Sequence, residues 1–222
     1  MSKFVPKRIK LHHKDNLIPD GTRRCVILGK SESGKTSVLP SILEKLHEFT
    51  YLFIFAKNFE DPVYEFLREK YKDKHVFCSR ELNPDIILKR EDKLKEHKHN
   101  VCIIDDFDNK KEIGQKMGFL FQRGRHLNMS TYLIVQNWFE QVPDIIRNNI
   151  NEVMVFNTSK FPYVAQSLGI NEESVQMKQW YNEVLEKPFQ FLYVITGGSF
   201  IPDVLKIRKN LDGVLTRKIP IV

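Results

Sequence analysis

A glycine-rich segment of the chain has the residue types needed to hold a polyphosphate. Glycine permits the tight turn in which successive backbone N–H groups face an anion. In the pattern G-x-x-x-x-G-K-[ST], the lysine reaches the β- and γ-phosphates of a nucleotide, and the hydroxyl binds Mg²⁺. We therefore expect Lys35 to contact the phosphates and Thr36 the metal ion. The full nucleotide-binding segment reads Gly29, Lys30, Ser31, Glu32, Ser33, Gly34, Lys35 and Thr36.

Glu32 is an unusual residue for such a loop. Its carboxylate carries the same sign of charge as the phosphates, and like charges repel. We expect Glu32 either to point away from the phosphates or to pair with Lys30.

Two acidic residues follow an apolar run further along the chain. Residues 101–104 are Val, Cys, Ile and Ile, and they lead directly into Asp105 and Asp106. We expect Asp105 to hold the Mg²⁺ shell and Asp106 to polarise the attacking water. An ordinary acidic turn would give the same pattern, but the phosphate loop upstream favours the catalytic interpretation. The second acid is more commonly Glu, so Asp106 is one methylene shorter than usual.

A third apolar run, residues 132–135, ends in Gln136 and Asn137. An amide at the end of a strand can hydrogen-bond the γ-phosphate or the lytic water. We therefore expect Gln136 to take part in hydrolysis. The alternative is a loop-starting Gln-Asn pair with no catalytic role.

Cationic residues gather where a predicted helix ends, between the acid pair and Gln136. They are Arg123, Arg125 and His126. Cations at a helix C-terminus stabilise the helix dipole, which is one interpretation. The other is an arginine finger that enters the nucleotide site of a neighbouring subunit. Arg147 is a weaker candidate for that role.

The elements that must position these residues alternate between strands and helices. Short runs rich in Ile, Val, Phe and Tyr predict strands, and apolar residues at helical spacing predict helices. The predicted strands are 24–28, 51–56, 75–78, 101–105, 131–136, 152–157 and 189–196. The predicted helices are 35–48, 63–71, 84–95, 110–124, 143–149, 161–168 and 172–186.

The predicted strands lack polar alternation, so both of their faces are expected to be buried. This indicates an α/β fold with a mostly parallel central sheet, helices on both faces and right-handed crossovers. The active site of such a sheet lies at the carboxyl ends of the strands. The phosphate loop, the acid pair and Gln136 all follow strand ends, so we expect them to meet there.

A chain of 222 residues is long enough for one α/β domain with a full core. Its apolar runs are far shorter than the roughly 20 residues that a membrane span needs, and its N-terminus has no apolar signal segment. Cys25, Cys78 and Cys102 lie in separate strand-like runs without CxxC spacing, which indicates buried thiols rather than disulfides or a zinc site. We therefore expect a soluble protein of a reducing intracellular compartment.

The net charge of +7 is concentrated at the two ends of the chain. Residues 1–24 carry seven Lys/Arg against two Asp, and residues 203–222 carry five against two. We expect a basic N-terminal arm at 1–21, a catalytic domain at 22–202 and a basic C-terminal tail at 203–222. Basic tails are often only solvated surface, so this charge is a weak indication of a polyanionic partner.

Four blocks of sequence, in this order and spacing, resemble the FtsK/HerA superfamily of DNA-pumping ATPases. They read GKSESGKTS, VCIIDDFD, QRGRHLNMSTYLIVQN and VPDIIRNNINEVMVF. The similarity covers about residues 22–170 and is greatest to the genome-packaging ATPases of nucleocytoplasmic large DNA viruses and virophages. Bacterial FtsK translocases carry a similar KARAAGIHLVLATQ stretch. On that match Arg125 aligns with the family's trans-acting arginine, and Gln136 with its sensor glutamine.

The resemblance implies a P-loop fold of the RecA-like (ASCE) type and an ATPase that uses ATP and Mg²⁺. It implies a motor that translocates double-stranded DNA as a homo-oligomeric ring, pentameric or hexameric, and packages a viral genome. A capsid protein is then an expected partner, and no membrane association is expected. The expected location is the host-cell cytoplasm, at the viral factory, or the virion.

Two other classes of protein remain open from the residues alone. A small-molecule kinase or a GTPase-like switch also has a phosphate loop, but residues 109–112 (NKKE) fail the base-reading motif N-K-x-D at its last position. A kinase would also use an Arg-rich lid rather than a strand that ends in Gln. A non-enzymatic DNA-binding protein with an inactive phosphate loop is disfavoured by the intact Lys35, Thr36, Asp105 and Asp106.

Overall fold

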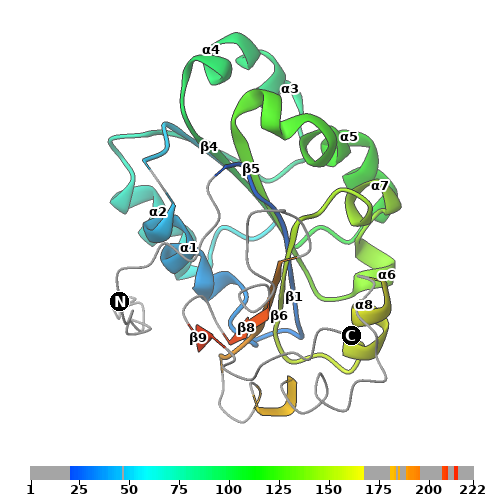
Figure 1. The fold of residues 1–222 in the computed structure, drawn as a ribbon. Coiled ribbons are helices and arrows are strands. Elements are labelled where there is room, and N and C mark those ends of the chain that lie inside the picture. The colour runs from blue at the N-terminus through cyan, green and yellow to red at the C-terminus, as the bar shows by residue number, and fades with distance from the viewer. Residues whose placement is uncertain are drawn as a thin grey trace.

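A mostly parallel β-sheet forms the centre of the described part of the chain (Figure 1). The computed structural model describes residues 21–46, 48–167, 181–183, 185, 189–195, 207–209 and 213–214. Within these residues the sheet has nine strands in the order β3-β2-β4-β5-β1-β6-β7-β8-β9. The strands from β3 to β6 pair in parallel, whereas β7, β8 and β9 are antiparallel additions. Their bounds are β1 (Arg24–Leu28), β2 (Tyr51–Ala56), β3 (His75–Ser79), β4 (Asn100–Asp105), β5 (Met129–Val135), β6 (Glu152–Val155), β7 (Leu192–Ile195), β8 (Ile207–Lys209) and β9 (Gly213–Val214).

Strand β1 shows why these strands are apolar on both sides. Cys25 and Ile27 belong to one core cluster, and Val26 and Leu28 belong to the other. The two sets alternate because successive side chains of a strand point to opposite faces. Every residue of β2, β4 and β5 is likewise buried. The α/β class and the mostly parallel sheet expected from the sequence are confirmed.

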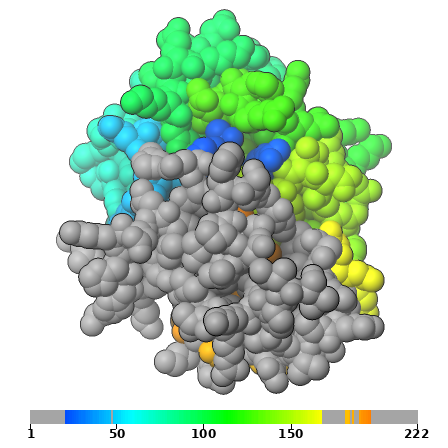
Figure 2. All heavy atoms as spheres, in the orientation of Figure 1, coloured from blue at the N-terminus to red at the C-terminus, as the bar shows by residue number. Residues whose placement is uncertain are grey.

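Helices cover both faces of the sheet (Figure 1). Apolar residues of α1 and α2 pack into one core cluster, and those of α3 to α8 pack into the other. The segment from α3 to α5 forms the top of the molecule in the space-filling view (Figure 2). The helices are α1 (Leu39–Lys45), α2 (Pro62–Lys70), α3 (Asp85–Leu88), α4 (Glu91–Glu96), α5 (Lys110–Arg123), α6 (Trp138–Gln141), α7 (Asp144–Arg147) and α8 (Phe161–Ser167), with the 3-10 turns η1 (Thr36–Val38) and η2 (Gly124–Leu127).

Three predicted helices differ from the observed ones. The helix expected at 35–48 begins as the 3-10 turn η1 and becomes α-helical at α1, where Pro40 occupies the first turn. The helix expected at 84–95 is divided at Arg90, whose φ of −118° is not helical. The helix expected at 172–186 lies largely outside the described residues, of which 181–183 and 185 are helical. Helix α6 was not predicted, because its four residues are too few to show a helical period.

Strand β3 corrects the prediction for one cysteine. Cys25 and Cys102 are buried, but Cys78 is exposed. Its strand is at the edge of the sheet and pairs only with β2 among the described strands, so part of it faces solvent. The buried-thiol interpretation therefore holds for Cys25 and Cys102 and was wrong for Cys78.

Some of the residues counted with the basic ends of the chain belong to the sheet or pack against it. Arg23, counted with the basic N-terminal residues, is 1% exposed and pairs with Glu152 at 3.3 Å. Arg24 is the first residue of β1. At the other end, β8 and β9 lie inside the segment 203–222 that was expected to be a tail. Residues 1–20, which include nearly all of the predicted arm, lie outside the described residues.

Candidate active site

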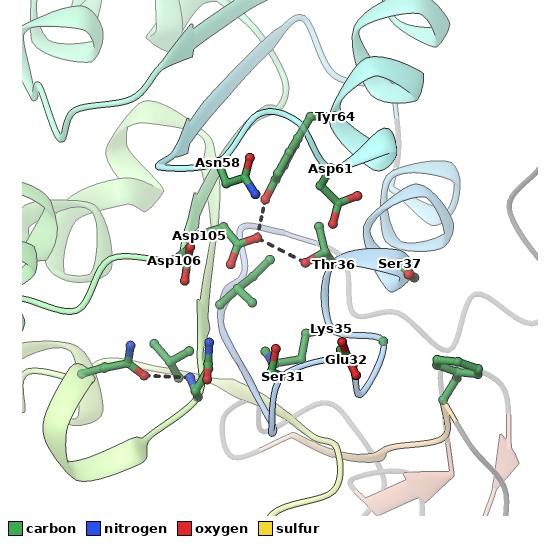
Figure 3. A pocket seen from close by; sticks show the side chains of 16 residues that line it. Ser31, Glu32, Lys35, Thr36, Ser37, Asn58, Asp61, Tyr64, Asp105 and Asp106 are labelled. Atoms are coloured by element: carbon green, nitrogen blue, oxygen red, sulfur yellow. Dashed lines mark hydrogen bonds between the residues drawn. The ribbon is translucent and has the colours of Figure 1, made fainter. Parts of the chain in front are cut away.

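A cavity opens at the carboxyl ends of β1, β4 and β5 (Figure 3). Its volume is about 360 Å³. Most of the residues predicted to do chemistry line it, and they come from segments far apart in the sequence. The lining includes Ser31, Glu32, Gly34, Lys35, Thr36, Asn58, Asp61, Tyr64, Asp105, Asp106, Gln136, Gln141 and Phe189.

The phosphate loop is anchored on both sides by neighbouring strands. The Gly29 N–H donates to the carbonyl of Val135 at 3.2 Å, and the Lys30 N–H donates to the carbonyl of Asn157 at 2.9 Å. A Cβ at Gly29 would lie 2.6 Å from the Phe156 Cβ, so a side chain does not fit there. The loop is therefore held between the ends of β5 and β6, with its backbone free to face the cavity.

Two loop residues adopt the left-handed conformation that the tight turn requires. Gly34 has a φ of 97°, which glycine tolerates without steric cost, and Glu32 has a φ of 60°. The Glu32 side chain is exposed, and no ion pair joins it to Lys30 in the described part of the chain. Pairing with Lys30 is therefore not observed among these residues, and the exposed Glu32 side chain lines the cavity.

Lys35 is oriented by the loop itself. It is 8% exposed, and its Nζ donates to the carbonyl of Lys30 at 2.6 Å. Burial lowers the pKa of the Lys35 ammonium, while the carboxylates of Asp105 and Asp106 oppose this shift. The side chain thus lies across the loop, with the carboxylates of Asp105 and Asp106 nearby.

Asp105 accepts hydrogen bonds from two hydroxyl groups (Figure 3). Thr36 Oγ1 donates to its Oδ2 at 3.3 Å, and Tyr64 Oη donates to the same oxygen. Desolvation raises the pKa of Asp105 to about 6, although the hydrogen bonds from Tyr64 and Thr36 and the charge of Lys35 oppose the rise. Tyr64 lies in α2 and was not predicted, since no local motif marks it.

Thr36 and Asp105 provide the oxygen ligands that Mg²⁺ prefers. Their side-chain oxygens lie 3.3 Å apart, so the pair predicted to bind the metal is brought together. Within the described residues, no group of three or more His, Cys, Asp or Glu side chains is placed to hold a metal by itself. Mg²⁺ commonly keeps waters and takes ligands from substrate phosphates.

Asp106 lies beside Asp105 but in a different environment. It is exposed, lines the cavity and has a φ of 63°. Aspartate tolerates this left-handed conformation better than most residues do. The turn separates the two carboxyl groups into a buried one at the strand end and a solvated one beyond it.

Gln136 also lines the cavity, and its loop is held by a residue that was not predicted. The backbone N–H groups of Gln136 and Asn137 both donate to Gln141 Oε1 at 2.7 Å. Gln141 Nε2 donates to Asp108 Oδ1 at 3.0 Å, and Lys57 Nζ contacts the other Asp108 oxygen at 3.1 Å. We call Lys57, Asp108 and Gln141 the polar link. It joins the ends of the three neighbouring strands β2, β4 and β5.

Arg125 lies near the amino end of β5, whereas the phosphate loop lies at the carboxyl ends of the strands. It is an exposed residue of η2, which precedes β5, and it lines a separate cavity with Lys98, His99 and Asn128. The seven residues of β5 separate it from Gln136, a distance of about 20 Å for an extended strand. No ion pair involves Arg125 within the described residues. Arg125 therefore does not line the cavity that contains the phosphate loop of its own chain.

The other cationic candidates do not line the cavity either. Arg123 and His126 are exposed and flank the start of η2. Arg147 pairs with Asp144 in its own helix and lies over the ring of Phe139. Its Nη2 is therefore engaged, whereas its buried Nη1 has no hydrogen-bond partner among the described residues.

Comparisons with known proteins agree with this geometry. The sequence model of a family described as Poxvirus A32 protein matches residues 10–180. A search of curated proteins gives no significant match. No helix among the described residues is long and apolar enough to cross a membrane.

Several solved structures share the fold. The genome packaging NTPase B204 from Sulfolobus turreted icosahedral virus 2, in complex with AMPPCP, has a TM-score of 0.57 at 17% identity and covers 85% of this chain and 96% of that chain. B204 from Sulfolobus Turreted Icosahedral Virus, described as the DNA-packaging ATPase, has a TM-score of 0.54 at 17% identity, covering 86% and 97%. EssC (ATPases 2 and 3) from Geobacillus thermodenitrificans has a TM-score of 0.53 at 13% identity, covering 84% and 41%. The fold is that of P-loop ATPases.

Proposed function

The chain belongs to the Poxvirus A32 protein family, and from this premise we propose that it is an ATP-hydrolysing motor that moves double-stranded DNA into a viral capsid. The B204 proteins, whose fold it shares, are described as a genome packaging NTPase and a DNA-packaging ATPase. Both the family and the fold support a role in genome packaging.

One observation carries the enzymatic part of the proposal. Lys35, Thr36, Asp105, Asp106 and Gln136 come from three separate segments of the chain and line one cavity at the carboxyl edge of the sheet. Together they provide a cation for phosphates, a pair of metal ligands, a solvated carboxylate and an amide. These are the groups that phosphoryl transfer to water requires.

Each group has a distinct role in this proposal. The loop N–H groups and Lys35 bind the β- and γ-phosphates, and Thr36 and Asp105 hold Mg²⁺, which neutralises developing charge on the phosphate oxygens when bound. Asp106, solvated and one residue beyond, orients the attacking water and takes its proton. Gln136 contacts the γ-phosphate or this water and so distinguishes the nucleotide before and after hydrolysis.

The assembly is the part of the proposal that reaches beyond a single chain. We propose a homo-oligomeric ring of five or six subunits around double-stranded DNA, acting with a capsid protein in the host-cell cytoplasm. The position of Arg125 supports this arrangement, because an exposed arginine remote from its own nucleotide site can reach the site of a neighbour. In such an interface Arg125 stabilises charge on the transferring phosphoryl group.

Phosphate release from Mg·ATP, with and without linear double-stranded DNA, tests the function. A DNA motor hydrolyses ATP and is stimulated by DNA, whereas a small-molecule kinase needs its acceptor and an inactive P-loop gives no turnover. The Lys35→Ala protein measures contaminating activity. The proposal would be contradicted if Lys35→Ala released phosphate as fast as the unsubstituted protein, or if DNA did not raise the rate of release.

A further inference from the structure

Phe189 is an exposed aromatic residue at the border of the candidate active site. Its side chain is 52% exposed and lines the cavity that contains the phosphate loop. Its φ of 63° places a bulky residue in the left-handed region, which costs conformational energy. Strained residues of this kind gather at functional sites, and so the ring calls for an explanation beyond packing.

The sheet topology places Phe189 on a defined side of the phosphate loop. Strand β7 is antiparallel to β6, with Leu192 opposite Val155, and Val155 is paired with Leu28 at the end of β1. The segment just before β7 therefore lies at the carboxyl edge, on the β6 side of the loop. Asp105 and Gln136 follow β4 and β5, which lie on the other side of β1.

The ring of Phe189 lies directly against the loop. A Cβ built on Gly34 would come within 2.8 Å of Phe189 Cδ1. Any side chain at position 34 would therefore displace the ring. The glycine thus has a second effect besides its φ of 97°: it leaves room for an aromatic face beside the phosphate-binding backbone.

We propose that Phe189 forms the base-binding surface of the nucleotide site, by stacking on the base of the bound nucleoside triphosphate. This inference rests on the proposed function. The γ-phosphate belongs beside Thr36 and Asp105, so the ribose and base extend away from them, towards the β6 side of the loop. An exposed aromatic ring offers a base stacking area there without any hydrogen-bonding group.

Stacking makes a specific prediction about selectivity. Every base has a π-face, so a ring that only stacks favours nucleotides over bare polyphosphate and discriminates little between adenine and guanine. Phe189 should therefore raise the affinity for ATP and GTP alike, relative to tripolyphosphate.

Calorimetric titration of the full chain with Mg·ATP, Mg·GTP and Mg·tripolyphosphate tests the inference. Phe189→Ala should weaken ATP and GTP binding on the order of tenfold and leave tripolyphosphate binding unchanged. Phe189→Trp should retain ATP binding. Addition of ATP should change the indole fluorescence of this variant more than that of the unsubstituted protein, and addition of tripolyphosphate should not. Tyr163→Ala is the matched control, because Tyr163 is 55% exposed, contacts Phe139 and lies outside the cavity.

Two results would overturn the base-binding role while leaving the proposed function intact. An equal loss for ATP and tripolyphosphate would mean that Phe189 only supports the loop. Unchanged ATP binding in Phe189→Ala would place the base elsewhere. Failure of the unsubstituted protein to bind either ligand would instead remove the proposed function, and this inference with it.

Discussion

At the scale of single residues, the site shows how a buried carboxylate is stabilised before it meets a metal ion. The same Asp105 oxygen accepts hydrogen bonds from Thr36 and Tyr64. The Thr36 hydroxyl can still donate to this oxygen when a lone pair of its own oxygen binds a cation, so binding of Mg²⁺ would not require this hydrogen bond to break. Tyr64 can remain as the partner that keeps Asp105 oriented.

The Lys35→Ala substitution should abolish ATP hydrolysis and leave the fold intact. Removal of a preorganised charge from the phosphates should cost at least about 10²-fold in kcat. The lysine makes one hydrogen bond to its own loop, so the free energy of unfolding should change by only about 1 kcal/mol. Phosphate release and thermal unfolding measure the two effects. Retained turnover would remove the phosphate loop from the mechanism.

The Asp106→Asn substitution should block the chemical step and preserve binding of ATP and Mg²⁺. Asparagine tolerates the φ of 63° as aspartate does, so only the charge and basicity change. We expect kcat to fall by at least about 10²-fold with little change in the Kd for ATP. Asp73→Asn, at an exposed acid outside the cavity, is the control. Weakened nucleotide binding would show that Asp106, too, belongs to the metal site.

The sequence predicted the cavity-lining candidates whose signals are local, and their catalytic roles stay predictions. The phosphate loop is eight consecutive residues, and Asp105, Asp106 and Gln136 each end an apolar run. Tyr64 and Gln141 could not be found in this way. Their roles exist only after α2 and α6 have packed beside other strand ends, and neither residue belongs to a motif.

At the scale of elements, the polar link shows what a very short helix can contribute. Helix α6 is capped by the Asn137 side chain and ends at Gln141. It turns the chain so that one amide accepts from two N–H groups of the β5 loop and donates to the β4 loop. The loop of Gln136 and the loop of the acid pair are thereby fixed relative to each other.

The Gln141→Glu substitution should lower kcat while leaving the KM for ATP almost unchanged. A glutamate can still accept from both N–H groups, but it cannot donate to Asp108 and repels it. Misplacement of the two loops should cost about 10- to 10²-fold in kcat. Steady-state kinetics separate kcat from KM, and Gln122→Glu on the exposed face of α5 is the matched control.

A second substitution tests whether the link itself is responsible. In the double variant Gln141→Glu with Asp108→Asn, the new amide can donate to the new carboxylate, so the hydrogen bond is restored with reversed polarity. Recovery of kcat in the double variant supports a positioning role. Equal loss in both variants would show that Gln141 acts by some route other than Asp108.

Prediction of the elements succeeded where the hydrophobic period was long enough to read. Strands β1 and β2 were predicted with their observed bounds, because each is a buried apolar run. The helix predicted at 84–95 was continuous, whereas the structure divides it at Arg90 into α3 and α4. At this break the Arg90 guanidinium lies 4.1 Å from the ring centroid of Phe77 in β3 and donates to the carbonyl of Ile86, and the contact with β3 forms only in the folded chain.

At the scale of the whole molecule, some of the basic terminal residues belong to the folded sheet or its core, and this decides which deletions can test the terminal charges. Deletion of residues 206–222 would remove β8 and β9 together with the charges, so it cannot isolate an electrostatic effect. Deletion of residues 1–14 removes five Lys/Arg and avoids both Arg23 and β1.

Removal of residues 1–14 should weaken DNA binding more than basal ATP hydrolysis. If these cations displace counterions from DNA, the slope of log K against log salt should become shallower by about 0.9 for every phosphate that the arm neutralises. Binding to duplex DNA at several salt concentrations measures the slope. An unchanged slope would assign the arm to solvated surface.

The Arg125→Ala substitution should leave ATP binding normal and abolish hydrolysis, on the order of 10³-fold or more for an arginine finger. Mixing this protein with Lys35→Ala should restore part of the activity, since some interfaces then join an intact loop to an intact arginine. A helix-terminal cation would instead cost only about 0.3–1 kcal/mol of stability. Arg123→Ala and Arg147→Ala are the controls. No recovery in the mixture, with subunit exchange confirmed, would mean that the site is complete within one chain.

The separation of Arg125 from the phosphate loop by the length of β5 also bears on the symmetry of any assembly that uses both. A two-fold axis pairs a surface with its own copy. A symmetric dimer therefore completes both sites only if one interface includes both the amino ends and the carboxyl ends of the strands. A heterologous contact joins unlike surfaces head to tail. It needs only the amino ends of the strands from one subunit and the carboxyl ends from the next. An open row of such contacts always leaves the nucleotide site of one terminal subunit without an arginine. Closure into a ring completes every site, whereas a rotation that fails to close would produce a helical filament.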